Sequence, residues 1–280
     1  MFSAVCPSFA QTSLYWDLNG NTTGAGTTPN GTWNGTTKNW SQVSGGNNTV
    51  DVWQSGFAAV FSAGTDATGA YTVTVSGTRS AASITIQDGT PTFTGGTLNF
   101  SGASPTLTIN SGRTLNWGST GLTSATSTLN KAGTGTLNFT QNLNFAGTVN
   151  FAGGTLQLTS AALTLTTLNI TGNTILDFSG TASSLNLTNF SISAGVTLTI
   201  QNWSAANDFF YTTNWTGATP DVMGSTPMNQ VTFSGFTANQ TGWDSFDNRI
   251  RPNVPEPAAY GAILLGSLTA LACWRRRPAA

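Results

Sequence analysis

Side chains that can carry out acid–base chemistry are scarce in this chain. Only 7% of the 280 residues are charged, none is His, and the single Glu is Glu256, whereas soluble proteins carry roughly 25% charged residues. Enzymes that cleave polysaccharides use pairs of carboxylates, and a lyase also needs a general base or an electrophile. The Asp residues are Asp17, Asp51, Asp66, Asp88, Asp177, Asp208, Asp221, Asp244 and Asp247, and the basic residues before the C-terminal tail are Lys38, Arg79, Arg113, Lys131, Arg249 and Arg251. So small a set predicts a protein that is not an enzyme. A polysaccharide-degrading β-helix enzyme remains as an alternative, ranked second after the adhesin described at the end of this subsection.

Metal, cofactor and nucleic-acid sites are not expected either. Asp17, Asn19 and Asn21 alternate like calcium ligands, but the segment lacks the Gly and the terminal Glu of an EF-hand loop. Asp and Asn also favour turns through bonds to their own backbone, so we expect a turn there. The net charge of −1 gives no electrostatic footprint for nucleic acid.

The N-terminal part of the chain is rich in Trp and Gly. Trp16, Trp33, Trp40 and Trp53 can form a sugar-binding platform if their rings are exposed. Bulky rings also close the open end of an apolar core, and we favour this second interpretation. Residues 201–243 show a similar enrichment, so residues 11–70 and 201–243 are predicted to be aromatic-rich caps.

The C-terminal residues predict a single membrane-spanning helix. Residues 258–274 carry no charge, and about 17 residues is the lower limit for crossing a bilayer. Arg275, Arg276 and Arg277 follow at once, so the positive-inside rule keeps this end in the cytoplasm and the body outside it.

Immediately before this span stands Val254-Pro255-Glu256-Pro257, where the two prolines hold the backbone extended. The motif, the apolar span and the arginine cluster, in this order over residues 254–280, resemble the PEP-CTERM sorting signal of Gram-negative bacteria. The resemblance implies recognition of Pro255, Glu256 and Pro257 by an exosortase, a membrane-bound processing enzyme. It also implies a protein that is first anchored in the membrane and then delivered to the cell envelope, the outer surface or the extracellular matrix.

The N-terminus resembles the end of a secretory signal. Ser8-Phe9-Ala10 has the small-x-small pattern of a cleavage site, and only Phe2 to Val5 form an apolar stretch before it. We interpret residues 1–10 as the remnant of a truncated signal peptide and expect the mature chain to begin near Gln11. Residues 244–253 are expected to be a linker to the tail.

The body between these ends repeats one sequence pattern. Runs of three to five residues alternate apolar side chains with Thr, Asn or Ser and then break at Gly, Asn or Ser, as in Tyr71–Val75, Ser83–Ile86, Thr97–Phe100, Thr106–Ile109, Thr136–Phe139, Thr155–Leu158 and Val196–Ile200. Strands this short bury a face only when successive coils stack. We therefore predict a parallel β-helix over residues 71–200, with an antiparallel β-sandwich as the alternative. Because charge is so rare here, stacked Asn and Thr are expected to bond one another between coils.

The segment from Lys131 to Leu158, with its Gly-Thr-Leu-Asn-Phe and Gly-Gly-Thr-Leu-Gln-Leu units, resembles the autotransporter-associated β-strand repeat. That resemblance implies an extended, right-handed parallel β-helix and a secreted protein. We expect an exported, non-catalytic surface or matrix protein that associates with exopolysaccharide. The alternative is an ice-binding or glycan-binding adhesin, because the pairs Thr72/Thr74, Thr106/Thr108, Thr164/Thr166 and Thr197/Thr199 are suited to flat ranks on a β-helix face.

Overall fold

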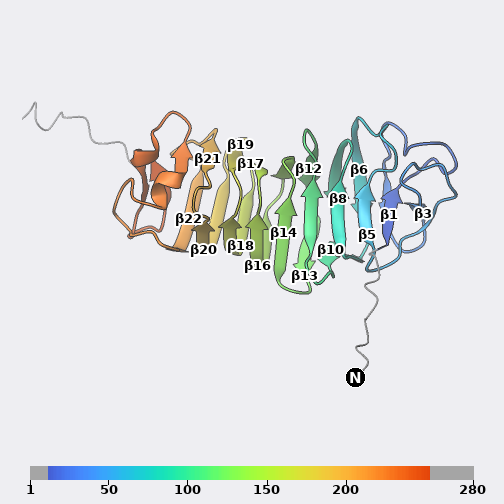
Figure 1. The fold of residues 1–280 in the computed structure, drawn as a ribbon, viewed down its shortest axis with the longest axis horizontal. Coiled ribbons are helices and arrows are strands. Elements are labelled where there is room, and N and C mark those ends of the chain that lie inside the picture. The colour runs from blue at the N-terminus through green and yellow to red at the C-terminus, as the bar shows by residue number, and fades with distance from the viewer. Residues whose placement is uncertain (1–11, 253–280) are drawn as a thin grey trace, which may run out of the picture.

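The computed structural model describes residues 12–252, and the chain winds there as a parallel β-solenoid along one long axis (Figure 1). Eleven strands form the long sheet. In spatial order these are β22 (Phe209–Trp215), β20 (Ser184–Ile192), β18 (Ala162–Ile170), β16 (Leu143–Phe151), β14 (Thr128–Ala132), β11 (Thr106–Ile109), β8 (Ser83–Ile86), β5 (Ala58–Phe61), β1 (Ser13–Trp16), β3 (Lys38–Ser41) and β4 (Asp51–Val52). The predicted parallel stacking is confirmed, and the β-sandwich alternative is wrong because the strands of the body pair in parallel.

A nine-stranded sheet forms the second wall. It contains β2 (Gly31–Trp33), β6 (Ala70–Val75), β9 (Thr90–Thr94), β12 (Thr114–Trp117), β15 (Thr136–Phe139), β17 (Gly154–Thr159), β19 (Thr174–Ser179), β21 (Leu198–Gln201) and β23 (Val231–Phe233). A short third sheet contains β7 (Thr78–Ala81), β10 (Thr97–Phe100) and β13 (Gly121–Ser124). The early coils therefore have three strands each. From β16 onward one nine-residue strand replaces two short ones, and in β16 a register shift between Phe145 and Thr148 marks the former corner.

The register between coils gives the repeat length. In the nine-stranded sheet Thr114 pairs with Thr136, Thr136 with Thr155, Thr155 with Ile175 and Ile175 with Thr199, which are spacings of 22, 19, 20 and 24 residues. Each coil thus advances by one strand spacing of about 4.8 Å, although the corners differ in length.

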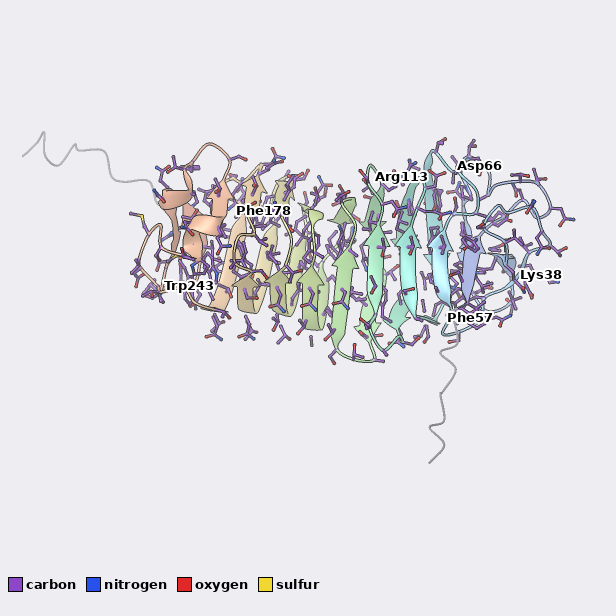
Figure 2. The ribbon with its side chains drawn as sticks, viewed as in Figure 1. Lys38, Phe57, Asp66, Arg113, Phe178 and Trp243 are labelled. Carbon is purple, nitrogen blue, oxygen red and sulfur yellow. The ribbon has the colours of Figure 1, made fainter. Side chains whose placement is uncertain are left out.

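The core lies between the sheets and follows from the period-two pattern. In strands such as β10, β11 and β12, Leu and the closing Phe, Ile or Trp are buried, while the Thr and Asn between them face outward and are half-buried. Phe178 lies between the sheets in this way, whereas Lys38 lies at the N-terminal end (Figure 2). No α-helix occurs within residues 12–252, where the only helical turns are the 3-10 segments η1 (Met228–Gln230) and η2 (Ala238–Gln240).

Both ends of the solenoid carry the expected aromatic clusters. Trp33 and Trp40 are fully buried at the N-terminal end, with ring centroids 5.1 Å apart. At the other end Phe190 packs against Phe210 and Trp215 with centroids 5.2 and 5.1 Å away. At both edges of the long sheet the chain direction reverses, because β3 and β4 run antiparallel beyond β1 and Arg249 forms an antiparallel bridge to Tyr211.

Residues 244–252 are part of the folded body, although the sequence predicts a linker at 244–253. Strand β25 (Ile250–Pro252) pairs antiparallel with β24 (Thr241–Trp243), and Ile250 is buried opposite Trp243. One apolar residue in a polar segment is enough to anchor a strand when a Trp lies across from it.

Outward-facing amides and hydroxyls bond to their counterparts in neighbouring coils, as predicted. In the long sheet Asn150 Nδ2 donates to Asn130 Oδ1 at 2.8 Å, and Asn169 Nδ2 donates to Asn150 Oδ1 at 2.8 Å. In the nine-stranded sheet Asn138 Nδ2 donates to Asn116 Oδ1 at 3.0 Å. These ladders satisfy the polar surface without charge.

Candidate functional site

Two predicted features lie outside the described residues 12–252. They are the sorting motif at Val254, Pro255, Glu256 and Pro257, and the arginine cluster that is expected to act as a cytoplasmic stop, Arg275, Arg276 and Arg277. The same holds for the expected membrane span at 258–274 and for residues 1–10. Across residues 12–252 the structure contains no helix of the length and apolarity that membrane crossing requires.

The four N-terminal Trp residues are part of the core. Trp16, Trp33 and Trp40 have no exposed surface, and Trp53 is 6% exposed. Trp40 and Trp53 pack with centroids 4.6 Å apart. These rings close the end of the solenoid and offer no exposed face to a sugar.

Most carboxylates fix backbone or neighbouring side chains. Asp66 accepts hydrogen bonds from the backbone N–H groups of Ala25 and Gly26 at 2.8 and 3.0 Å. Asp88 is buried and forms an ion pair with Arg113 at 2.8 Å. Such side chains organise turns and corners.

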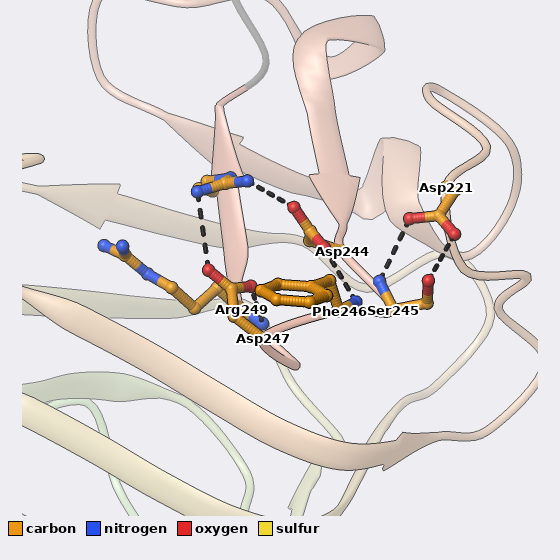
Figure 3. A network of polar contacts seen from close by, with 7 residues as sticks. Asp221, Asp244, Ser245, Phe246, Asp247 and Arg249 are labelled. Carbon is orange, nitrogen blue, oxygen red and sulfur yellow. Dashed lines mark hydrogen bonds and ion pairs between the residues drawn. The ribbon is translucent and has the colours of Figure 1, made fainter.

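One group of carboxylates and an arginine does line a hollow. Asp221, Asp244 and Arg251 border a depression of about 110 Å³ at the C-terminal end, and Arg251 pairs with Asp244 and, at 3.5 Å, with Asp247 (Figure 3). The Ser245 hydroxyl and backbone N–H donate to Asp221 at 2.5 and 3.0 Å and hold the pKa of Asp221 below its ordinary value. All three side chains are engaged with one another or with Ser245, so the arrangement stabilises the loops at this end of the solenoid.

The segment Asp17–Asn21, which was compared with a calcium-binding loop, forms a turn as expected. Asp17 Oδ1 accepts the backbone N–H of Asn19 at 3.0 Å. Asp17 is fully buried, and its second oxygen, Oδ2, has no hydrogen-bond donor within residues 12–252. Burial is the main cause that raises the pKa of Asp17, and the negative charge of Asp66 adds to it. The described residues hold no group of three or more His, Cys, Asp or Glu side chains placed to bind a metal ion.

Lys131 is the deepest cation of the described chain. Its side chain is fully buried, and Nζ donates to the carbonyl oxygens of Gly133, Gly135 and Gly153 at 2.7, 2.9 and 2.7 Å. Nζ also lies 4.8 Å from the ring centroid of Phe151. Desolvation lowers the pKa of Lys131 to about 8, and the lysine ties the glycine corners of two consecutive coils together.

The predicted Thr-x-Thr pairs do not stack into one rank. Thr72 and Thr74 lie on β6 of the nine-stranded sheet, whereas Thr106 and Thr108 lie on β11 of the long sheet. A single column of Thr114, Thr136, Thr155 and Thr199 does run along the nine-stranded sheet, interrupted by Ile175. The column beside it is mixed, with Asn116, Asn138, Gln157, Asp177 and Gln201.

The surface feature most suited to a ligand was missed by the sequence analysis, which assigned its aromatic residues to the C-terminal cap. Phe209 and Tyr211 project from the outer face of β22, stacked with ring centroids 5.7 Å apart and planes inclined by 18°. Phe209 also lines a groove of about 200 Å³ that crosses β18, β20 and β22. The signal was present in Phe209-Phe210-Tyr211, because alternation buries the middle ring and turns the outer two toward solvent.

Comparisons with protein-family models, curated proteins and solved structures give no match for this chain. The fold and the contacts above therefore carry the functional argument.

Proposed function

We propose that this chain is an exported, non-catalytic protein of the cell surface or extracellular matrix of a Gram-negative bacterium, associated with exopolysaccharide. Its body is a β-solenoid with aromatic-rich ends, and right-handed winding is the sense that parallel β-crossovers strongly favour. The observation that carries the proposal is the outer surface. Uncharged Asn side chains bond from coil to coil on both large sheets, over three coils of the long sheet and two of the nine-stranded sheet.

This surface suits a hydrated polymer. Amide and hydroxyl groups that repeat at the strand spacing of about 4.8 Å can exchange hydrogen bonds with sugar hydroxyls. The ladder bonds fix the side chains beforehand, so that less conformational entropy is lost on binding. Asp66, Asp88 and Asp244 engage backbone or arginine partners, which agrees with a scaffold more than with a catalytic cleft.

Sorting is assigned to residues 254–280. We propose that an exosortase recognises Pro255, Glu256 and Pro257 while the apolar span 258–274 and the three arginines hold the chain in the membrane. The protein is anchored at first and reaches the envelope, the outer surface or the matrix after processing.

Cell fractionation tests this function. The intact chain is compared with a chain lacking residues 254–280 and with one in which Pro255, Glu256 and Pro257 are all replaced by Ala. We expect the deletion to abolish membrane association, and the triple substitution to leave the protein in the membrane fraction without onward delivery. Arg79→Gln, a change in the body, is the control and leaves the distribution unaltered. If the deleted chain shows the distribution of the intact one, the sorting role is wrong.

The adhesin alternative has one observation in its favour, the groove beside Phe209. Its ice-binding form is tested by whether the purified protein shapes growing ice crystals. Shaping that is lost on Thr136→Leu, in the centre of the Thr column, would replace the matrix role with ice binding.

A further inference from the structure

A groove runs along the solenoid axis where β18, β20 and β22 begin. The residues that line it are Asn142, Ser160, Ala161, Ala162, Ala182, Ser183, Ser184, Asn207 and Phe209. Ala162, Ser184 and Phe209 occupy one register column, so that small side chains form the floor and an aromatic ring stands at one end. With Asn142 at the other end the column spans three strand steps, or about 14 Å.

The polar groups of this groove have free hydrogen-bonding capacity. Asn142 Oδ1 accepts the backbone N–H of Ala162 at 2.8 Å, which holds the amide in place and leaves its NH₂ group to point outward. Ser184 Oγ accepts from Asn186 Nδ2 at 3.1 Å, and its hydroxyl proton remains available for donation. Asp208, next to Phe209, is buried beneath the groove, and its oxygens accept the backbone N–H groups of Ser183 and Ser204.

A cation stands beside the aromatic end. Arg249 Cζ lies 4.5 Å from the ring centroid of Phe209 and 5.9 Å from that of Tyr211. The Arg249 guanidinium points away from the network of Asp244, Asp247 and Arg251 (Figure 3) and forms no ion pair with any carboxylate of residues 12–252. The two rings hold the guanidinium in place, and no carboxylate of residues 12–252 neutralises its positive charge.

We propose that this groove binds an acidic polysaccharide, a chain of uronic acid units, with Phe209 and Arg249 as the anchoring residues. The apolar C–H face of one sugar ring packs against Phe209, and the Asn142 amide and the Ser184 hydroxyl bond to hydroxyls further along the chain. The Arg249 guanidinium receives a carboxylate, for which its planar donor array is suited. The groove is smaller than the roughly 300–1,000 Å³ of enclosed small-molecule pockets, and its run along the axis fits a polymer that continues past it.

Binding is measured with the full-length chain in mild detergent by calorimetry, using an oligouronate and its carboxyl-reduced, neutral counterpart. We expect the acidic oligomer to bind at least tenfold more tightly than the neutral one, and added salt to weaken only the acidic one. Phe209→Ala weakens binding of the acidic oligomer roughly tenfold. Arg249→Gln removes the preference for the acidic oligomer, whereas Lys38→Gln, which deletes the same charge at the opposite end, has no effect.

A blocking variant keeps the proposal testable if Phe209→Ala disturbs the fold. Ala162→Trp fills the floor of the groove and leaves both anchoring residues in place, so it abolishes binding. Ala70→Trp, the same substitution at an outward-facing alanine of β6, does not. Equal affinity for the acidic and neutral oligomers, or equal binding by the two Trp variants, overturns the proposal. This inference deepens the proposed matrix role by naming the class of polysaccharide, but it is measured on purified protein. Its failure would therefore leave the fractionation result standing, and the reverse also holds.

Discussion

Replacing Lys131 with Met tests whether a buried cation holds two coils together. The substitution keeps an unbranched side chain of similar length and deletes the ammonium group that donates to the carbonyl oxygens of Gly133, Gly135 and Gly153. The Gly135 oxygen keeps a second donor, the backbone N–H of Thr155 at 3.3 Å. A buried acceptor left without a donor costs about 1–3 kcal/mol, and this applies to the oxygen of buried Gly153. Gly133 is exposed to water and Gly135 keeps one donor, so each of these loses only about 1 kcal/mol. The three losses together come to about 3–5 kcal/mol. Loss of the cation–π contact with Phe151 adds about 1 kcal/mol.

The desolvated charge acts in the opposite direction. The pKa of Lys131 falls from 10.5 to about 8, and at about 1.4 kcal/mol per unit the charged form costs the folded state about 3 kcal/mol at pH 7. Met removes this cost. The net expectation is a loss of about 1–3 kcal/mol in the free energy of unfolding at pH 7.

The pH dependence separates this mechanism from a simple packing defect. Between pH 8 and 10.5 the unfolded chain keeps a proton on Lys131 that the folded chain has released, so the stability of the wild type rises with pH in this window. Without an amine at position 131 the variant lacks that rise. The difference in the free energy of unfolding between the wild type and Lys131→Met therefore widens from pH 7 to pH 10.

The assay is urea unfolding of the full-length chain, followed by tryptophan fluorescence at pH 7, 8, 9 and 10. Lys38→Met, at an exposed position, is the matched control and leaves both the midpoint and its pH dependence unchanged. The reasoning is refuted if Lys131→Met is as stable as the wild type at pH 7, or if its midpoint rises with pH as the wild-type midpoint does.

Three further predictions concern stability and use the same assay. Burial raises the pKa of Asp17, so the charge of Asp17 destabilises the fold increasingly as the pH rises above 3.8. Asp17→Asn is therefore expected to raise the urea midpoint at pH 7 but not at pH 3. A lower urea midpoint of this variant at pH 7 would contradict the prediction. Asn150→Ala breaks two ladder bonds and is expected to cost about 1–2 kcal/mol, whereas Asn214→Ala, which loses one exposed bond, costs less; equal losses would show that the ladder adds nothing. A Cβ at Gly154, where φ is +86°, would lie 2.5 Å from a backbone carbonyl oxygen, so Gly154→Ala is expected to cost more than 2 kcal/mol. Gly195→Ala, at φ +75° with no atom within 4 Å, provides the comparison and should cost about 1 kcal/mol.

The strands of the body could be predicted closely from the sequence. Thr97–Phe100, Thr106–Ile109 and Thr136–Phe139 coincide with β10, β11 and β15. Their period-two alternation is a local property, and tertiary contacts reinforce it because every coil buries the same face. The bonding of Asn to Asn also followed, since few other arrangements satisfy a charge-poor surface.

The features that depend on register could not be predicted. Phe209 and Ala162 meet in one column because the corners before β18 and β22 have particular lengths, and nothing in either residue's neighbourhood encodes that pairing. Lys131 looks like an ordinary surface lysine in the sequence, and its burial depends on carbonyl groups that two different coils contribute. Strand β25, within the predicted linker at 244–253, is only three residues long, so it shows no period-two pattern in the sequence.

The antiparallel segments at the two ends of the long sheet have a consequence for self-association. A parallel coil stack with bare edges would offer each molecule a template for the next, and copies would polymerise head to tail into fibrils. Strands β3 and β4 at one end, and the bridge from Tyr211 to Arg249 at the other, reverse the chain direction at those edges. The parallel ladder of the long sheet therefore stops within each molecule, which disfavours its continuation into a second copy.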